Sequence, residues 1–170
     1  AARGVGAVAG TGGRAIASAD AYTESESLIV ELTARGGNGG SAAGGARSAG
    51  GRSVSLKDRV RGRSGGTLLL RQSALAGDGG SLSVEAPEVA DGAGLMSGRG
   101  GDAMSVLTQN AGAIETDQPL SLQLAAVGGH GGQAFRLAPA NEGGRAKVAG
   151  GGAAEGECPL VAEAIGGAGT

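Results

Sequence analysis

Two stretches of the chain, SLIVELTARGGNGGSA at residues 27–42 and PLSLQLAAVGGHGGQA at residues 119–134, decide the fold. They align without gaps, and eight of their sixteen positions are identical, among them all four glycines of a Gly-Gly-x-Gly-Gly box. Each stretch is a short run of alternating apolar residues followed by the box. Repetition of such a unit predicts an architecture built by stacking, in which each unit buries its apolar face on its neighbours.

The alternation within these stretches predicts strands with one buried face. Leu120, Leu122, Leu124 and Ala126 lie on one side of an extended chain, and the run from Leu28 to Ala34 repeats the pattern. Glycine accepts positive φ and lets one backbone pass close to another, so we expect the boxes to form tight turns. The predicted turn glycines are Gly36, Gly37, Gly39, Gly40, Gly128, Gly129, Gly131 and Gly132.

The rest of the chain contains further candidate strands and no apolar stripe at helical spacing. The candidate strands are 28–34, 54–60, 68–76, 82–86, 104–108, 120–127 and 135–138, with weaker ones near Val148 and Val161. Many start about 14 to 16 residues apart. Two strands per coil would give coils of about 30 residues, and the two boxes would then lie three coils apart.

The expected fold is therefore all-β: a glycine-rich parallel β-solenoid that forms a single repeat domain over residues 1–170. An antiparallel β-sandwich would accommodate the same strand spacing. A third possibility is that the glycine-rich stretches pack as polyproline-II-like helices.

Composition limits the core and the functional classes. The chain has 38 Gly, one Phe, one Tyr and no Trp, so its core must be thin. The single Cys158 has no partner for a disulfide within the chain, and no apolar run is long enough to span a membrane. The chain begins at Ala1 rather than Met, from which we expect a processed subunit or a fragment of a longer protein. Scarce cysteine and aromatics favour an extracellular or cell-surface location.

One predicted strand carries a basic row, which we define as Lys57, Arg59, Arg61 and Arg63. These residues alternate with Val54, Leu56, Asp58 and Val60 of the opposite face. Such a row predicts binding of polyanions, above all anionic glycans. The alternative is a solvated strand face whose charges prevent unwanted pairing. Nucleic acid is not an expected partner, because the aromatic side chains that stack on bases are nearly absent.

The chain offers few groups for chemistry. His130 is the only histidine and lies inside the second box, and Cys158 has no histidine near it in sequence. The segment 98–104, GRGGDAM, resembles a calcium-binding nonapeptide, but only one copy carries the Asp in that position. We therefore expect no calcium at this segment, and we expect Asp78 and His130 to be turn residues. No cofactor, no metal and no enzymatic activity are expected.

Charge is unevenly divided along the chain. Residues 1–71 carry ten basic and five acidic groups, whereas residues 72–170 carry four basic and eleven acidic groups. In a solenoid, position in sequence maps onto position along the stacking axis. Opposite ends would then attract each other and favour head-to-tail assembly of copies of the chain.

The boxes followed by Ala or Ser, which alternate with short apolar strands, resemble the repeat regions of bacterial surface proteins of the filamentous-hemagglutinin and autotransporter-adhesin type. The resemblance spans most of residues 10–134. It implies a parallel β-helix exported to the cell surface for adhesion or matrix building. We therefore expect a structural subunit of an extracellular filament, sheath or matrix that assembles with itself. The alternative function is an adhesin-like module that binds anionic glycans through the basic row.

Overall fold

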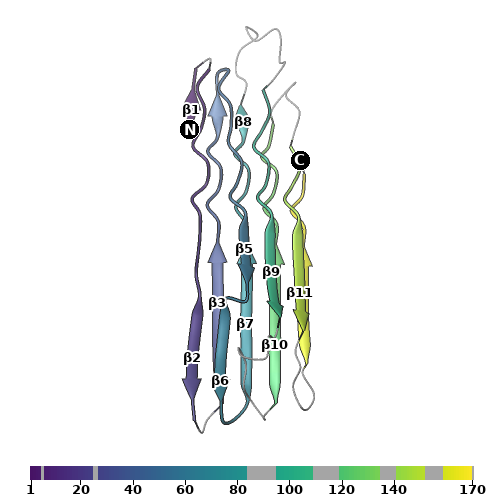
Figure 1. Cartoon of the computed structure of the whole chain (residues 1–170). Coiled ribbons are helices and arrows are strands. Elements are labelled where there is room, and N and C mark those ends of the chain that lie inside the picture. Colours follow the sequence, from purple (N-terminus) through teal and green to yellow (C-terminus); the bar gives the residue numbers. More distant parts are fainter. Residues whose placement is uncertain are drawn as a thin grey trace.

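The computed structural model describes residues 1–4, 6–24, 27–83, 95–108, 119–134, 141–151 and 159–169. Every regular element among them is a β-strand, and the strands run along the long axis of the molecule (Figure 1). The strands are β1 (Ala2–Arg3), β2 (Ala19–Thr23), β3 (Leu28–Arg35), β4 (Ala42–Ala43), β5 (Val54–Lys57), β6 (Val60–Ser64), β7 (Leu68–Leu75), β8 (Leu82–Ser83), β9 (Ala103–Thr108), β10 (Leu120–Val127), β11 (Ala146–Gly151) and β12 (Leu160–Ile165). In these residues the structure contains no helix that could cross a membrane.

The strands form parallel sheets, and the predicted all-β class is confirmed. The largest sheet has the order β12-β10-β7-β3, and the others have the orders β11-β9-β5, β2-β6 and β1-β4-β8. Every pairing between these strands is parallel. The antiparallel β-sandwich that the strand spacing would also accommodate is therefore wrong.

The chain alternates between passages in two opposite directions along the long axis (Figure 1). The rising passages contain β1, β3 with β4, β7 with β8, β10, and β12, whereas the falling passages between them contain β2, β5 with β6, β9, and β11. Strands that follow each other in sequence thus belong to different sheets. The purple-to-yellow colouring runs across the width of the molecule, so each passage lies beside passages close to it in sequence (Figure 1).

Equivalent residues of successive rising passages pair in register. Leu28 pairs with Leu68, and Leu68 pairs with Leu120. The steps between equivalent positions are 40, 52 and 38 residues, so the expected spacing of about 30 residues is wrong. The two similar stretches of sequence lie in one sheet, two steps apart rather than three.

The main core lies between the sheets of rising and falling strands. In β10 the side chains of Leu120, Leu122, Leu124 and Ala126 are buried, as the alternation predicted. Other buried members of this core are Val30, Leu32, Ala34, Val54, Leu56, Val60, Leu68, Leu70, Ala74, Ala103 and Leu107. A second, small core of Ala42, Ala46 and Leu82 lies at the other end of the long axis, where β4 and β8 pair.

The glycine boxes lie between these two cores, in a segment that we call the waist. The sequence-based expectation of turns is wrong for all eight box glycines: Gly36, Gly37, Gly39, Gly40, Gly128, Gly129, Gly131 and Gly132. Among the described glycines, positive φ occurs at Gly4, Gly6, Gly44 and Gly45, and none of these belongs to the two boxes. The box glycines serve close approach instead: a Cβ built on Gly129 would overlap the carbonyl oxygen of Gly77.

In the waist, rising and falling passages are hydrogen-bonded directly to each other. The Gly37 N–H donates to Gly13 O (2.9 Å), the Arg52 N–H to Gly37 O (3.0 Å), and the Gly77 N–H to Arg52 O (2.9 Å). This row continues through Gly101, Gly129 and Gly144 to Gly167, and a second row runs through Gly10, Gly40, Ala49, Gly80, Gly98 and Gly132. Cross-bonding residues on one passage are three apart, which is the period of a polyproline II helix.

Candidate functional site

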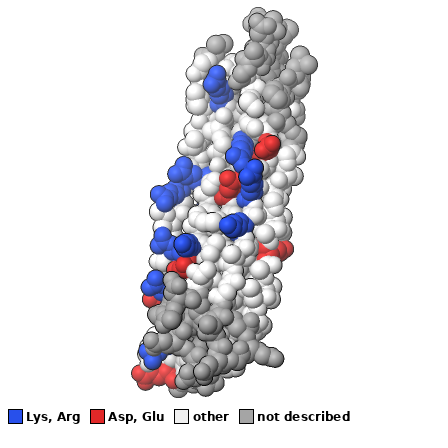
Figure 2. All heavy atoms as spheres, turned by 45° about the vertical axis from the view of Figure 1, so that its right-hand side comes forward, with Lys and Arg blue, Asp and Glu red and all other residues white. Residues whose placement is uncertain are grey.

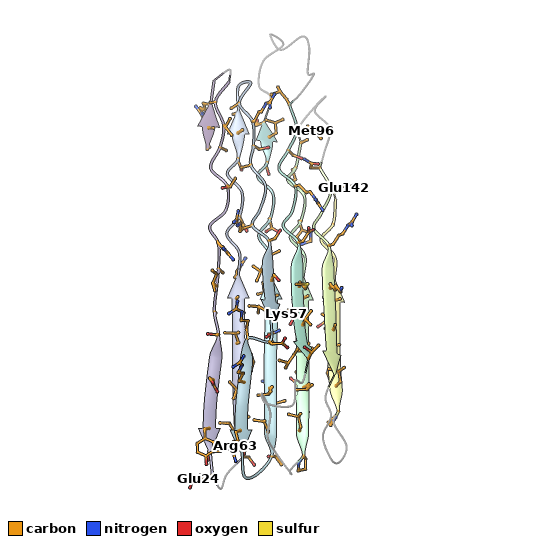
Figure 3. The ribbon with its side chains drawn as sticks, viewed as in Figure 1. Glu24, Lys57, Arg63, Met96 and Glu142 are labelled. Atoms are coloured by element: carbon orange, nitrogen blue, oxygen red, sulfur yellow. The ribbon has the colours of Figure 1, made fainter. Side chains whose placement is uncertain are left out.

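The basic row lies on the outer face of the second long falling passage. Lys57 ends β5, Arg61 and Arg63 belong to β6, and all four members of the row are exposed. Figure 3 shows Lys57 and Arg63 at different heights of this passage. In Figure 2 basic side chains lie along the left of the view and across its upper centre, whereas much of the remaining described surface is uncharged. The fold thus brings the four residues chosen from the sequence onto one outward face.

The neighbours of the basic row differ along its length. At its lower end the Arg63 guanidinium lies 5.7 Å from the centre of the Tyr22 ring, a distance suited to a cation–π contact. The Tyr22 hydroxyl in turn donates to Glu24 Oε1 at 3.0 Å. Toward the waist, no described residue forms an ion pair with Lys57 or Arg59. The positive charge is therefore least compensated at the upper end of the row.

The falling passage changes partners in the middle of the basic row. β5 pairs with β9 on one side, whereas β6 pairs with β2 on the other. Between them Asp58 has a positive φ of 49°, which marks a local break in the strand. Such a break frees backbone groups that need other hydrogen-bond partners.

Gln72 of β7 supplies these partners from the opposite sheet. Its side chain is polar but fully buried, and the register places it between the buried Leu32 and Leu124 of the neighbouring strands. Gln72 Oε1 accepts from the Arg59 N–H (3.1 Å), and Gln72 Nε2 donates to Leu56 O (3.3 Å). Further acceptors of Nε2 are Val106 O and Ser105 Oγ, both at 3.1 Å. Sequence reasoning missed this residue; its signal was a polar side chain at an inward position of a strand.

The middle residues of the boxes form a second arrangement that the sequence did not predict. Asn38 Oδ1 accepts from the Asp78 N–H (3.0 Å), and Asp78 Oδ1 accepts from the His130 N–H (2.8 Å). His130 Nδ1 then accepts from the Ala168 N–H (3.0 Å). Each side chain thus satisfies an outward N–H of the next rising passage. Asp78 and His130 connect extended passages and are not turn residues.

Asp102 has the same kind of role on the falling passages. Its Oδ1 accepts from the Arg145 N–H (2.8 Å) and from Arg99 Nη2 (3.2 Å). The described residues contain no group of three or more His, Cys, Asp or Glu that could hold a metal ion. Cys158 lies outside the described residues.

Both ends of the stack are open. β12 pairs with β10 on one edge only and is exposed along its whole length, with Val161 60% exposed and Ile165 48% exposed. At the other end, the falling passage with β2 pairs with the passage of β6, and Ile16 is 65% exposed. The first long passage falls and the last one rises (Figure 1). Each end thus exposes a passage without a further neighbour among the described residues.

The described geometry thus contains two candidate interaction surfaces, the basic row and the open ends. Comparisons of the chain with protein-family models, with curated proteins and with solved structures find no match.

Proposed function

We propose that the chain is a glycine-rich parallel β-solenoid that joins head to tail, as a structural subunit of an extracellular filament, sheath or matrix. The observation that carries this proposal is the complementarity of the two open ends. One end presents a falling passage and the other a rising passage. The last rising passage of one copy and the first falling passage of the next together make one complete coil. The resemblance of the boxes to surface-protein repeats supports the same location.

The hydrogen bonds of the waist give the expected register of the joint. Their first row begins at Gly13, whose N–H has no acceptor among the described residues, and ends at Gly167, whose carbonyl has no described donor. Joining the ends lets Gly13 of one copy donate to Gly167 of the neighbouring copy. The first row of waist hydrogen bonds then continues from one copy into the next, and it still alternates between rising and falling passages.

The same register covers the open strand edges. β12 would pair with β3 of the neighbouring copy, since each of these strands has a partner on one side only. An open, apolar edge strand is a template for such pairing, and burial of Val161 and Ile165 favours it. Residues 1–71 carry a basic excess and residues 72–170 an acidic excess. Attraction between these unlike ends favours the same head-to-tail orientation of the copies.

We expect the purified chain to form filaments in negative-stain electron microscopy as its concentration is raised, at low and at high salt. The variant Gly13→Ala should form filaments only at clearly higher concentration than the wild type, with an unchanged or slightly higher melting temperature. A Cβ on Gly13 meets nothing within 4 Å in the single chain, whereas one on Gly144, at an equivalent position, would overlap Gly101 O of the preceding falling passage. Arg52, at another equivalent position, shows that a Cβ can be accommodated there, so a weaker joint is expected rather than none. Wild-type chain that remains monomeric throughout contradicts the proposal. Filaments of the Gly13→Ala variant at the same concentrations as the wild type would contradict the register alone.

The exposed, weakly compensated upper part of the basic row favours a second candidate function: a surface module that binds anionic glycans. From Lys57 to Arg63 the row presents a cation at every second residue. Neighbouring cations are therefore about 7 Å apart along the strand. Such a spacing gives a long polyanion repeated charge contacts without base or aromatic stacking.

We expect the chain to be retained on an immobilised heparin column and eluted by salt, since contacts of lysine and arginine with sulfate and carboxylate groups are screened by ions. The triple variant Lys57→Ala, Arg59→Ala, Arg61→Ala should elute at clearly lower salt. Arg35→Ala, an exposed arginine at the end of β3 on the other sheet, is the single-charge control. Equal elution of triple variant and wild type would exclude the row as the binding surface.

A further inference from the structure

A groove of about 350 Å³ opens on the outer face of the falling passages. It lies between residues 14–17 of the first falling passage and residues 51–59 of the second. β5 is paired on its other edge, by β9, and forms no ladder with residues 14–17. The groove is therefore built along an edge of β5 that has no ladder partner.

The groove exists because the two passages differ in length. Val8 pairs with Arg47 and Ala19 pairs with Val60, so the second passage has two more residues between these points than the first. The break at Asp58 takes up the difference. The passages rejoin below it, in the pairing of β2 with β6. The unpaired stretch is thus a fixed consequence of the register.

Three arginines line the groove, namely Arg14, Arg52 and Arg59, and no carboxylate does. Among the described residues none forms an ion pair with these three side chains. Two of them stand on backbone that is held in place: the N–H and C=O of Arg52 both belong to the waist hydrogen bonds, and the Arg59 N–H donates to Gln72. Guanidinium groups bind oxyanions in bidentate geometry, and a fixed backbone lowers the cost of ordering them.

The rest of the lining fits a sugar better than an isolated ion. Ser53 and Ser55 supply hydroxyl groups, and the exposed Ile16 supplies an apolar wall. The volume lies at the small end of the range of about 300–1,000 Å³ that is typical for ligand pockets. A single oxyanion would fill only a fraction of it, whereas the ring of a short saccharide could contact the apolar wall and the hydroxyls together.

We infer that this Arg groove binds a short stretch of anionic saccharide through sulfate or carboxylate groups, and that it is the anchoring subsite of the basic row, which it meets at Arg59. The inference rests on the second proposed function. The inference goes beyond that function because it adds Arg14 and Arg52, which are not members of the row. It also limits the tightest contact to a few sugar units.

The test compares two single variants that remove one exposed arginine each. Arg14→Ala changes the groove and leaves the row intact, whereas Arg61→Ala changes the row and leaves the groove intact. Binding of a heparin-derived tetrasaccharide is measured by titration calorimetry at constant ionic strength. We expect Arg14→Ala to raise Kd about tenfold or more and Arg61→Ala to raise it less than twofold. A desulfated tetrasaccharide distinguishes the two anions, since binding that survives desulfation is carried by the carboxylates.

Three results would overturn the inference. Equal weakening by both variants would place the binding along the row as a whole, which leaves the second proposed function intact. An unchanged Kd for Arg14→Ala would do the same. Failure of the wild-type chain to bind either tetrasaccharide would overturn the groove and the row together. Melting temperatures of both variants, and Arg14→Gln as a second groove variant, show that any loss is not a loss of folding.

Discussion

Gly77→Ala is expected to lower the free energy of unfolding by about 3 kcal/mol or more. A Cβ at this position would overlap Gly37 O, lie 2.5 Å from Gly37 C and lie 3.1 Å from Arg52 N. All three atoms belong to backbone, so no side chain can move aside. Relief requires one passage of the waist to shift, which breaks the hydrogen bonds that Gly77 makes with Arg52 and Gly101. Overpacking and lost buried hydrogen bonds are among the few mechanisms that produce effects of this size.

The measurement is thermal and denaturant unfolding followed by circular dichroism. A loss of about 3 kcal/mol corresponds to a fall in Tm of about 6 to 12 °C for a chain of this size. Gly151→Ala, at the end of β11, is the matched control, because a Cβ there meets nothing within 4 Å. That control should change stability by less than about 1 kcal/mol, and in the stabilising direction, since alanine reduces the entropy of the unfolded chain. Equal effects of the two substitutions would exclude close approach as the reason for the glycine.

The strands could be predicted from sequence because their signal is local. The alternation in residues 120–127 depends only on which side chains face the core, and β10 has these same bounds. The spacing of the repeat could not be predicted in the same way. Successive steps differ in length, and two chain segments of different length can still bring Leu28, Leu68 and Leu120 into register.

The role of the box glycines was misread because glycine permits two different things. A tight turn needs positive φ and a close backbone contact needs the absence of a Cβ, and glycine suits both. Only the path of the neighbouring passage decides which of these two roles a Gly-Gly-x-Gly-Gly box has. Gly37 and Gly40 bond across the waist to Gly13 and Gly10, which is a long-range relation. Turns are formed instead at Gly44 and Gly45, outside the boxes. The three-residue spacing of Gly37 and Gly40 was visible in the sequence, but it was hidden within a low-complexity motif.

The candidate surfaces divide in a similar way. The outward direction of the basic row followed from parity along one strand, and its four members are exposed as expected. The Arg groove depends on residues 14–17 lying next to residues 51–59, and this contact is set by the pairing of β2 with β6. Arg14 carried no local signal that distinguished it from other basic residues. Only the register brings it to Arg52 and Arg59.

Gln72→Leu is expected to destabilise the chain by about 2 to 4 kcal/mol, although it replaces a polar side chain in the core by an apolar one of similar size. The new leucine would continue the column of Leu32 and Leu124 and gain apolar contacts. It would also leave the partly buried Arg59 N–H without its acceptor and remove the side-chain donor from the buried Leu56 O. A buried group that loses its partner costs about 1–3 kcal/mol, and the lost acceptor of the Arg59 N–H together with the lost contacts of Nε2 to Leu56 O, Ser105 Oγ and Val106 O outweighs the apolar gain.

Gln123→Leu separates this effect from the general effect of replacing glutamine in a strand. Gln123 lies on the outer face of β10, where its Oε1 accepts from Arg71 Nε at 2.8 Å in a partly exposed contact. Water can replace that partner, so we expect a change of less than about 1 kcal/mol in the same unfolding experiment. If Gln72→Leu were as stable as the wild type, the break at Asp58 would not depend on the opposite sheet. If it is destabilised as expected, the buried amide fixes the backbone of Arg59, and the polar core residue and the basic surface of the falling passage belong to one structural unit.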